Sequence, residues 1–281
     1  METLSLGELK LTWLDGGDNH LDGGAMFGVV PKALWSKNYE ENEKNQIPLR
    51  TDPILIQKEN KNFLIDTGLG VAKLTEKQKR NFGVTRESNL IPALEELGVS
   101  PENINAVLMT HLHFDHACGL TSVKEERFVS AFQNAEIFVT KTEWDEMRSP
   151  NLRSRNTYWK QNWEAISKQV VPFDESVSII SEIEMIKTGG HSDGHAIIRL
   201  ESDGHAAYHL GDLLGTHAHQ NPLWVMAYDD YPVTSVLQKE RWLKKAVDEK
   251  AWLTFYHDYY YRALKWNDKG VIIDSVKIQR D

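Results

Sequence analysis

The chain has 281 residues, 41% of them hydrophobic, and carries a formal net charge of −9 at pH 7. This acidic balance argues against nucleic acid and against an anionic membrane surface as partners, because both require basic residues. The one cysteine, Cys118, excludes an intramolecular disulfide and fits a reducing compartment. Residues 1–10 lack the pattern of a signal peptide, and no window is apolar enough to span a membrane. We therefore expect a single domain over residues 1–281, located in the cytoplasm.

The first part of the chain predicts strands around one helix. Alternating leucines over residues 4–13 predict edge strands that are broken at Gly7. Residues 23–31 are too rich in glycine for a helix and too apolar for a solvated loop, so we expect either a cavity lining or a plain buried connection. The runs that follow predict strands over 53–57, 63–65 and 106–109 and a helix over 88–97. This order implies a crossover connection and a covered sheet.

Residues 142–168 differ from the rest, because tryptophan and tyrosine alternate with arginine around Pro150. We expect two short helices joined by a basic loop. The segment is a lid over a site, a contact between the subunits of a homodimer, or an amphipathic pair that packs locally, and these alternatives stay open. The remaining apolar runs predict strands over 135–140, 183–187, 196–200, 206–210, 252–255 and 271–278 and a helix over 233–250.

A dense group of ionisable side chains follows the buried run at 106–109. It contains His111, His113, Asp115 and His116 within six residues. Imidazole and carboxylate are the ligands of zinc and similar divalent ions. Four such groups in one loop are costly without a cation, so a chance cluster of polar residues is the weaker alternative.

Three more candidate ligands lie just beyond later strands: His191, Asp212 and His257. Loops at one edge of a layered α/β sheet build a common site, so these residues should join the first group. Seven ligands are enough for two ions. We predict His111, His113 and His191 on one ion and Asp115, His116 and His257 on the other, with Asp212 as the bridge between them.

Two further residues are candidates for orienting the ligands. Asp66, in the sequence Asp66-Thr67-Gly68, either caps a turn or holds a metal-binding loop. His195 either starts a strand or orients an imidazole, and its phase with His191 favours the second role. We expect His20, His205 and His209 to be surface or core residues. We expect Cys118 to be a small buried residue near a helix start, not a ligand.

The pattern His-x-His-x-Asp-His, followed by Gly-His, Gly-Asp and a late histidine, resembles the metallo-β-lactamase superfamily. The turn Asp66-Thr67-Gly68 matches that family's upstream turn. The resemblance implies an αββα four-layer sandwich of two pseudo-equivalent halves that meet at the metal cleft. Residues 24–32 (GAMFGVVPK) and 221–232 (NPLWVMAYDDYP) also resemble the group of quorum-quenching lactonases, which is related to organophosphate-hydrolysing enzymes.

One departure from the best-known acyl-homoserine lactonases of this fold concerns a tyrosine three residues after the bridging aspartate. That tyrosine contacts the substrate, whereas here the position is Gly215. His217, Tyr228 and Tyr231 are candidates to replace it. Together with Met26, Phe27 and Trp224 they form the expected substrate pocket.

The expected activity is the opening of small lactones, with N-acyl-homoserine-type lactones as the leading class. Water between two divalent ions, most simply Zn²⁺, ionises near neutral pH and can attack the lactone carbonyl. Asp115 is the expected proton shuttle, and Asp212 is counted with it as catalytic. The main alternative is hydrolysis of aryl esters or phosphotriesters at the same centre. A metal-bearing scaffold that only binds a ligand and a mononuclear iron thiol or thioester enzyme are weaker alternatives.

Overall fold

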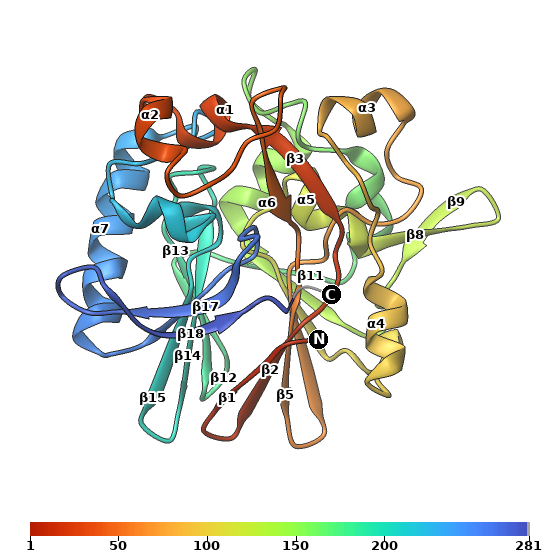
Figure 1. Ribbon diagram of the computed structural model, residues 1–281. Helices are drawn as coiled ribbons and strands as arrows, with labels where there is room; N and C mark the ends of the chain where they lie inside the picture. The colour runs from red at the N-terminus through yellow and green to blue at the C-terminus, as the bar shows by residue number, and fades with distance from the viewer. Residues whose placement is uncertain (280–281) are drawn as a thin grey trace.

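Two seven-stranded sheets form the centre of the computed structural model, which describes residues 1–279 (Figure 1). In order across the first sheet lie β1 (Thr3–Leu6), β2 (Leu9–Trp13), β5 (Ile54–Lys58), β6 (Lys61–Ile65), β7 (Ala106–Leu108), β10 (Glu136–Thr140) and β11 (Val170–Phe173). In order across the second lie β12 (Ser176–Ile180), β13 (Ile183–Lys187), β14 (Ala196–Ser202), β15 (His205–His209), β16 (Trp252–Thr254), β17 (Tyr261–Trp266) and β18 (Ile272–Lys277). The chain thus builds one sheet before it starts the other.

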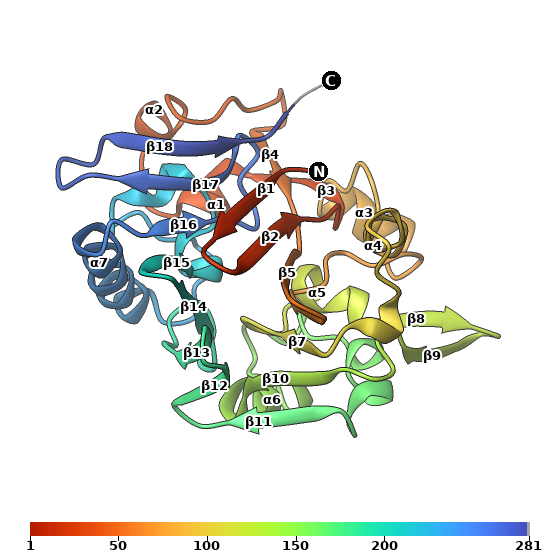
Figure 2. The ribbon, with the colours of Figure 1, turned by 90° about the horizontal axis from the view of Figure 1, so that it is seen from below.

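Helices cover the outer face of each sheet (Figures 1 and 2). On the first sheet, α4 (Leu90–Glu96) and α6 (Lys141–Arg148) contribute buried side chains such as Leu94 and Trp144 to a core shared with that sheet. On the second sheet, α7 (Pro232–Asp248) contributes Trp242 and Leu243. A third core lies between the sheets. This order of layers confirms the predicted αββα sandwich, since strands with two apolar faces must be covered on both sides.

The smaller elements lie at the margins of the sandwich. Two short hairpins pair β3 (Asp18–Asp22) with β4 (Gln46–Arg50) and β8 (Thr121–Lys124) with β9 (Arg127–Ser130). The remaining helices are α1 (Gly23–Phe27), α2 (Lys32–Trp35), α3 (Glu76–Asn81) and α5 (Phe114–Ala117). Among residues 1–279, no helix is long and apolar enough to cross a bilayer.

The expectation that residues 23–31 are not helical is wrong for their first part. The carboxylate of Asp22 accepts the backbone N–H of Ala25 and starts α1, which ends at Phe27 before Gly28. Met26 and Phe27 are buried against Trp35, and this burial outweighs the low helix propensity of two glycines. The helix lies above the end of the sandwich where the strand-end loops gather (Figure 1).

The expectation of two helices within residues 142–168 is half right. Helix α6 forms, because the hydroxyl of Thr140 accepts the N–H of Glu143 at its start. The rest of the segment consists of turns and two short 3-10 helices, Lys160–Asn162 and Glu164–Ile166. Tyr158 and Ile166 pack into the outer core of the first sheet.

Candidate metal centre

All seven predicted ligands lie together at one end of the two sheets. His111, His113, Asp115 and His116 follow β7, Asp212 follows β15, and His257 follows β16, whereas His191 lies in the loop between β13 and β14. Three overlapping sets of ligand atoms each fall within 4.8 Å of one another. They are His111 with His113 and His191, Asp115 with His116 and His257, and His111 with His116 and Asp212.

Asp212 lies between the first two sets. Its Oδ2 is 3.2 Å from Nε2 of His191 and 3.9 Å from Nε2 of His111. Its Oδ1 is 3.3 Å from Nε2 of His257 and 3.4 Å from Nε2 of His116. Each oxygen therefore faces a different set, which is the arrangement that lets one carboxylate bridge two cations.

Hydrogen bonds on the far side of the rings fix how two of these imidazoles point. Nδ1 of His116 lies 2.8 Å from Asp66 Oδ2, to which the hydroxyl of Thr110 also donates at 2.7 Å. Because the Thr110 proton is used on Asp66, its oxygen accepts from Nδ1 of His111 at 3.1 Å. Both rings consequently carry a proton on Nδ1 and turn Nε2, the nitrogen that is available to a metal ion, toward Asp212.

His191 and His257 are also oriented by a hydrogen bond from Nδ1. Nδ1 of His191 donates to Asp229 at 2.8 Å, and Nδ1 of His257 donates to the carbonyl of Arg50 at 2.7 Å. As a result Nε2 of His257 faces Nε2 of His116 at 3.2 Å. Two lone pairs aimed at each other repel unless a cation or a proton lies between them, so this donor set fits a divalent metal ion.

Burial and neighbouring charges shift the pKa values of these groups. Burial, followed by the neighbouring imidazoles, lowers the pKa of His111 and His113 well below the usual value, which leaves neutral rings. Burial lowers the pKa of His116, His191 and His257, but the charge of Asp212 outweighs it and the net shift is upward, unlike that of the other two imidazoles. Burial alone would raise the pKa of Asp212, but the three imidazoles of His257, His116 and His191 hold it well below its usual value. Neutral imidazole and ionised carboxylate are the forms that bind metal.

His195 contacts the bridging residue through the backbone. Its Nε2 accepts the N–H of Asp212 at 3.2 Å, and its Nδ1 lies 3.1 Å from the hydroxyl of Thr188. Gly211, directly before Asp212, has a positive φ of 52°, and an added Cβ would lie 2.7 Å from that Nε2. Glycine is therefore required for the close approach that positions Asp212.

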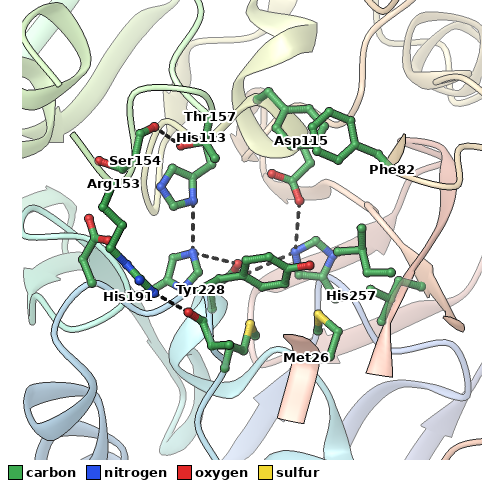
Figure 3. Close-up of a pocket in the computed structure, with 17 residues that line it drawn as sticks. Met26, Phe82, His113, Asp115, Arg153, Ser154, Thr157, His191, Tyr228 and His257 are labelled. Carbon is green, nitrogen blue, oxygen red and sulfur yellow. Dashed lines mark hydrogen bonds and ion pairs between the residues drawn. The ribbon is translucent and has the colours of Figure 1, made fainter. Parts of the chain in front are cut away.

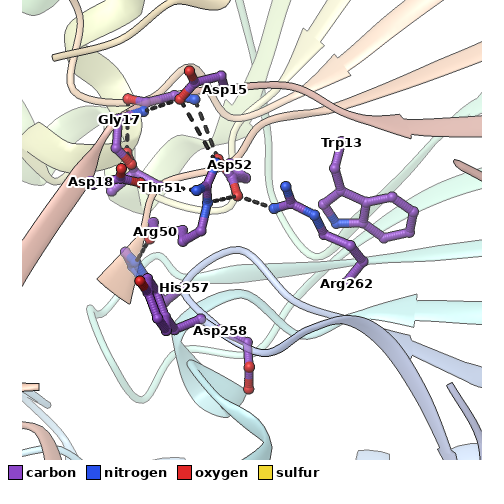
Figure 4. A network of polar contacts seen from close by, with 12 residues as sticks. Trp13, Asp15, Gly17, Asp18, Arg50, Thr51, Asp52, His257, Asp258 and Arg262 are labelled. Carbon is purple, nitrogen blue, oxygen red and sulfur yellow. Dashed lines mark hydrogen bonds and ion pairs between the residues drawn. The ribbon is translucent and has the colours of Figure 1, made fainter. Parts of the chain in front are cut away.

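A buried ion-pair network holds the His257 loop (Figure 4). Asp52 is fully buried and accepts from Arg50 Nε at 2.5 Å and also from Arg262. The backbone of Arg50 exchanges two hydrogen bonds with His257, one of them the contact to Nδ1 and the other from Arg50 N–H to the His257 carbonyl at 3.2 Å. The N–H of Asp52 donates to the carbonyl of Tyr256 at 3.1 Å. The network thus fixes the backbone on which His257 stands.

Two of the supporting carboxylates are absent from the sequence-based candidates. Asp229 lies within residues 221–232, where the resemblance directed attention to Trp224, Tyr228 and Tyr231 and not to this carboxylate. Glu143 accepts from the backbone N–H of Leu112, the hydroxyl of Tyr158 and the hydroxyl of Ser192, all within 2.8 Å. Glu143 thereby ties the 111–116 loop to the 190–195 loop. The one available signal was an acidic residue in the first turn of a helix, which is also an ordinary helix-start feature.

A cavity of about 310 Å³ opens directly beside the ligands (Figure 3). Arg153, Ser154 and Thr157 line it on the side of His113 and His191. The side near Asp115 and His257 is apolar, with Phe82 and Met26 in its wall. The further lining residues are Leu21, Leu49, Phe114, Met226, Ala227, Tyr228 and Asp230. The segment that follows α6 therefore supplies a wall of the cavity as well as local packing.

Of the six predicted pocket residues, two line the cavity and four do not. Met26 and Tyr228 line the cavity. Phe27 is instead buried between Trp35 and His219, and Trp224 packs edge-on against Phe27. His217 is held by Asp258, with 2.6 Å between Nδ1 and Oδ2, and Tyr231 lies at the start of α7, outside the lining. Proximity in sequence to a pocket motif does not decide which side chains face the pocket.

The comparisons with known proteins agree with this geometry. Residues 47–257 match the family model of the metallo-beta-lactamase superfamily. The chain belongs to this superfamily. An N-acyl homoserine lactonase of Bacillus thuringiensis is 24% identical over 159 residues, which are 53% of this chain and 57% of that protein. A "probable metallo-hydrolase" of Mycobacterium tuberculosis is 24% identical over 220 residues, 67% of this chain and 66% of that protein. The chain thus spans somewhat more than half the length of the curated lactonases that it matches.

Several solved structures superpose over nearly the whole chain. A "probable metal-dependent hydrolase" from Staphylococcus aureus is 46% identical, with a TM-score of 0.95 and 99% of each chain covered. AidC, described as a dizinc quorum-quenching lactonase, is 20% identical with a TM-score of 0.79 and covers 100% of this chain and 98% of its own. AbOPH, described as a hydrolase in the beta lactamase superfamily, also has 20% identity and a TM-score of 0.79, and covers 99% of this chain and 97% of its own. The chain is a metallo-hydrolase related at low identity to quorum-quenching lactonases.

Proposed function

We propose that this metallo-hydrolase opens small lactones, with N-acyl homoserine lactones as the leading substrate class. The observation that carries the proposal is the cavity beside the ligands, which has one polar wall and one apolar wall. A homoserine lactone with an acyl chain has the same division, since its ring and amide are polar and its chain is apolar. The 24% identity over 159 residues to an N-acyl homoserine lactonase of Bacillus thuringiensis supports the same substrate class.

The ligand assignment is part of the proposal. His111, His113 and His191 would hold one divalent ion, and Asp115, His116 and His257 the other, with Asp212 shared between them. Zn²⁺ is the simplest occupant, because imidazole and carboxylate suit it. Such a pair of ions supplies an acidified water and an electrophile for the carbonyl oxygen.

The side chains around that centre have distinct tasks. Asp115 lies at the cavity surface, with Oδ2 3.7 Å from Nε2 of His257, where a carboxylate can accept a proton and return it to the departing oxygen. Asp66 and Asp229 accept from Nδ1 of His116 and His191 and orient both rings so that Nε2 points into the site. The apolar wall keeps bulk water away from the bound ester group.

The experiment uses metal-replete full-length protein with three substrates: N-hexanoyl homoserine lactone, a p-nitrophenyl ester and a diethyl aryl phosphotriester. Ring opening is followed by mass spectrometry. We expect the lactone to be opened with the highest kcat/KM of the three. Absence of lactone turnover would overturn the proposal. Preferred turnover of the phosphotriester would assign the same centre to organophosphate hydrolysis.

A further inference from the structure

The side of the cavity near Asp115 and His257 is poor in hydrogen-bond donors. Its wall contains Phe82 and Met26, and Phe114 stacks on Phe82 with 4.3 Å between the ring centroids. The polar atoms of Asp115 and His257 belong to the proposed ligand set. Apart from the proton that Asp115 can return to the departing oxygen, a hydrogen bond to an oxygen that gains negative charge on this side has to come from another residue.

Most donors on the opposite side already have protein partners. The hydroxyl of Thr157 donates to the carbonyl of Ser154 at 2.7 Å, and the hydroxyl of Ser154 lies 3.4 Å from Glu146 Oε1. Arg153 pairs through Nε with Asp230 at 2.8 Å and also donates to the carbonyls of Ala227 and Asp229. These groups shape the wall and hold the 221–230 loop against it.

Tyr228 differs from them. Its ring reaches into the cavity between His191 and His257 (Figure 3), and its hydroxyl has no hydrogen-bond partner within residues 1–279. Burial, followed by the charges of Asp22 and Asp115, raises the pKa of Tyr228 to about 12. The phenol is therefore protonated over the working pH range and can donate a hydrogen bond. The effect of Asp115 on this pKa agrees with a position of Tyr228 near the Asp115 side of the cavity.

The backbone on both sides of Tyr228 is fixed. The N–H of Ala227 donates to the carbonyl of Ala25 in α1 at 2.8 Å. The N–H of Asp230 donates to the carbonyl of His191 at 3.0 Å. Tyr228 is thus held between α1 and the loop that carries His191, which lowers the entropic cost of placing its hydroxyl over a substrate.

Other candidates for this donor are excluded by their positions. Tyr231 lies outside the cavity lining, and His217 is engaged by Asp258. At Gly215 an added Cβ would lie 2.4 Å from Cε of Met226, so Met226 already fills the space beside that position. The geometry leaves Tyr228.

We propose that Tyr228 is a catalytic residue whose hydroxyl donates a hydrogen bond to the leaving oxygen of the substrate. This role rests on the proposed hydrolase function and applies to lactones and to simple esters. It predicts selectivity by leaving group, since a hydrogen bond to the leaving oxygen matters most when that oxygen bears the most charge.

The test compares Tyr228→Phe with Tyr231→Phe, a matched control outside the cavity lining that also loses one phenol hydroxyl. The substrates are a lactone and a series of esters of one acid whose leaving groups range from alkyl alcohols to p-nitrophenol. For Tyr228→Phe we expect kcat to fall about 10- to 100-fold for the lactone and alkyl esters, and less than about 3-fold for the p-nitrophenyl ester. Tyr231→Phe should stay within about 2-fold of wild type throughout.

Metal content and melting temperature accompany the kinetics. Tyr228 is 40% exposed, so both variants should keep the wild-type values. An equal loss for every ester, or no loss for any, would overturn the role of Tyr228 while the hydrolase function stands. If wild-type protein opens no lactone but cleaves esters, the proposed substrate class fails and the ester series still decides the role of Tyr228. A protein inactive on the whole series would overturn both.

Discussion

Replacing Asp52 with asparagine tests whether the buried network in Figure 4 supports both the fold and His257. The change keeps the size of the side chain and removes its charge. Arg50 and Arg262 both contact Asp52 Oδ2, and the Arg262 side chain is 6% exposed. Removing one member of a buried pair costs about 3–5 kcal/mol when the other is left alone. Arg262 keeps Glu2 and Arg50 keeps Asp18, so we expect a smaller loss of about 2–3 kcal/mol.

The assay is calorimetric unfolding of chelator-treated protein, with Asp248→Asn as the matched control. Asp248 pairs with Lys244 on the exposed face of α7, where such a pair contributes about 0–1 kcal/mol. A loss of 2–3 kcal/mol corresponds to a melting temperature lower by about 3–5 °C for a chain of this length. Metal titration of Asp52→Asn should also show weaker binding of the ion assigned to Asp115, His116 and His257. Equal melting temperatures for the two variants would refute the argument.

Three further changes probe other parts of the site. Asp212→Asn should lower the bound metal by about one ion per chain in elemental analysis, because one carboxylate oxygen becomes an NH₂ group and the other loses its charge. Asp203→Asn, in the turn after β14, should leave the metal content unchanged. Gly211→Ala should destabilise the fold by about 1–3 kcal/mol and reduce activity, because the new Cβ meets His195; Gly204→Ala, also at positive φ but with open space around it, should cost about 1 kcal/mol and leave activity unchanged. Burial, with the charge of Lys239, lowers the pKa of His219 from the ordinary histidine value of about 6.5 to about 4. The unfolded chain therefore binds a proton that the folded chain does not, so stability is complete above about pH 6.5 and falls as the pH drops toward 4; His219→Gln should flatten this dependence in urea titrations by up to about 3 kcal/mol.

The positions of the ligands could be anticipated because they depend on local rules. His111 to His116 crowd into six residues, and only a loop with a common focus accommodates them. Asp212 and His257 follow strands β15 and β16, which are parallel and therefore end at the same edge. Strand periodicity and parallel pairing carry this information within short windows of sequence.

The supporting groups could not be anticipated in the same way. Asp229 meets His191 across 38 residues, and Arg262 meets Asp52 across 210. Each is an ordinary charged residue in its own neighbourhood, and only the packed fold defines its partner. The error at α1 has a similar origin, since the helix there is stabilised by contacts of Met26 and Phe27 with Trp35 rather than by the propensity of its own residues.

The hydrogen bonds at Nδ1 of the imidazoles come from different parts of the fold. His111 and His116 are oriented by Thr110 and Asp66, both at strand ends of the first sheet. His191 and His257 are oriented by groups from outside their own loops, Asp229 in the 221–230 loop and the carbonyl of Arg50 in β4. Ring orientation is consequently set by hydrogen bonds that the protein itself makes. The 221–230 loop also carries Tyr228, so the element that orients His191 places the proposed donor over the same cavity. A change that displaces this loop should therefore alter metal affinity and leaving-group selectivity together, whereas Tyr228→Phe should alter the selectivity alone.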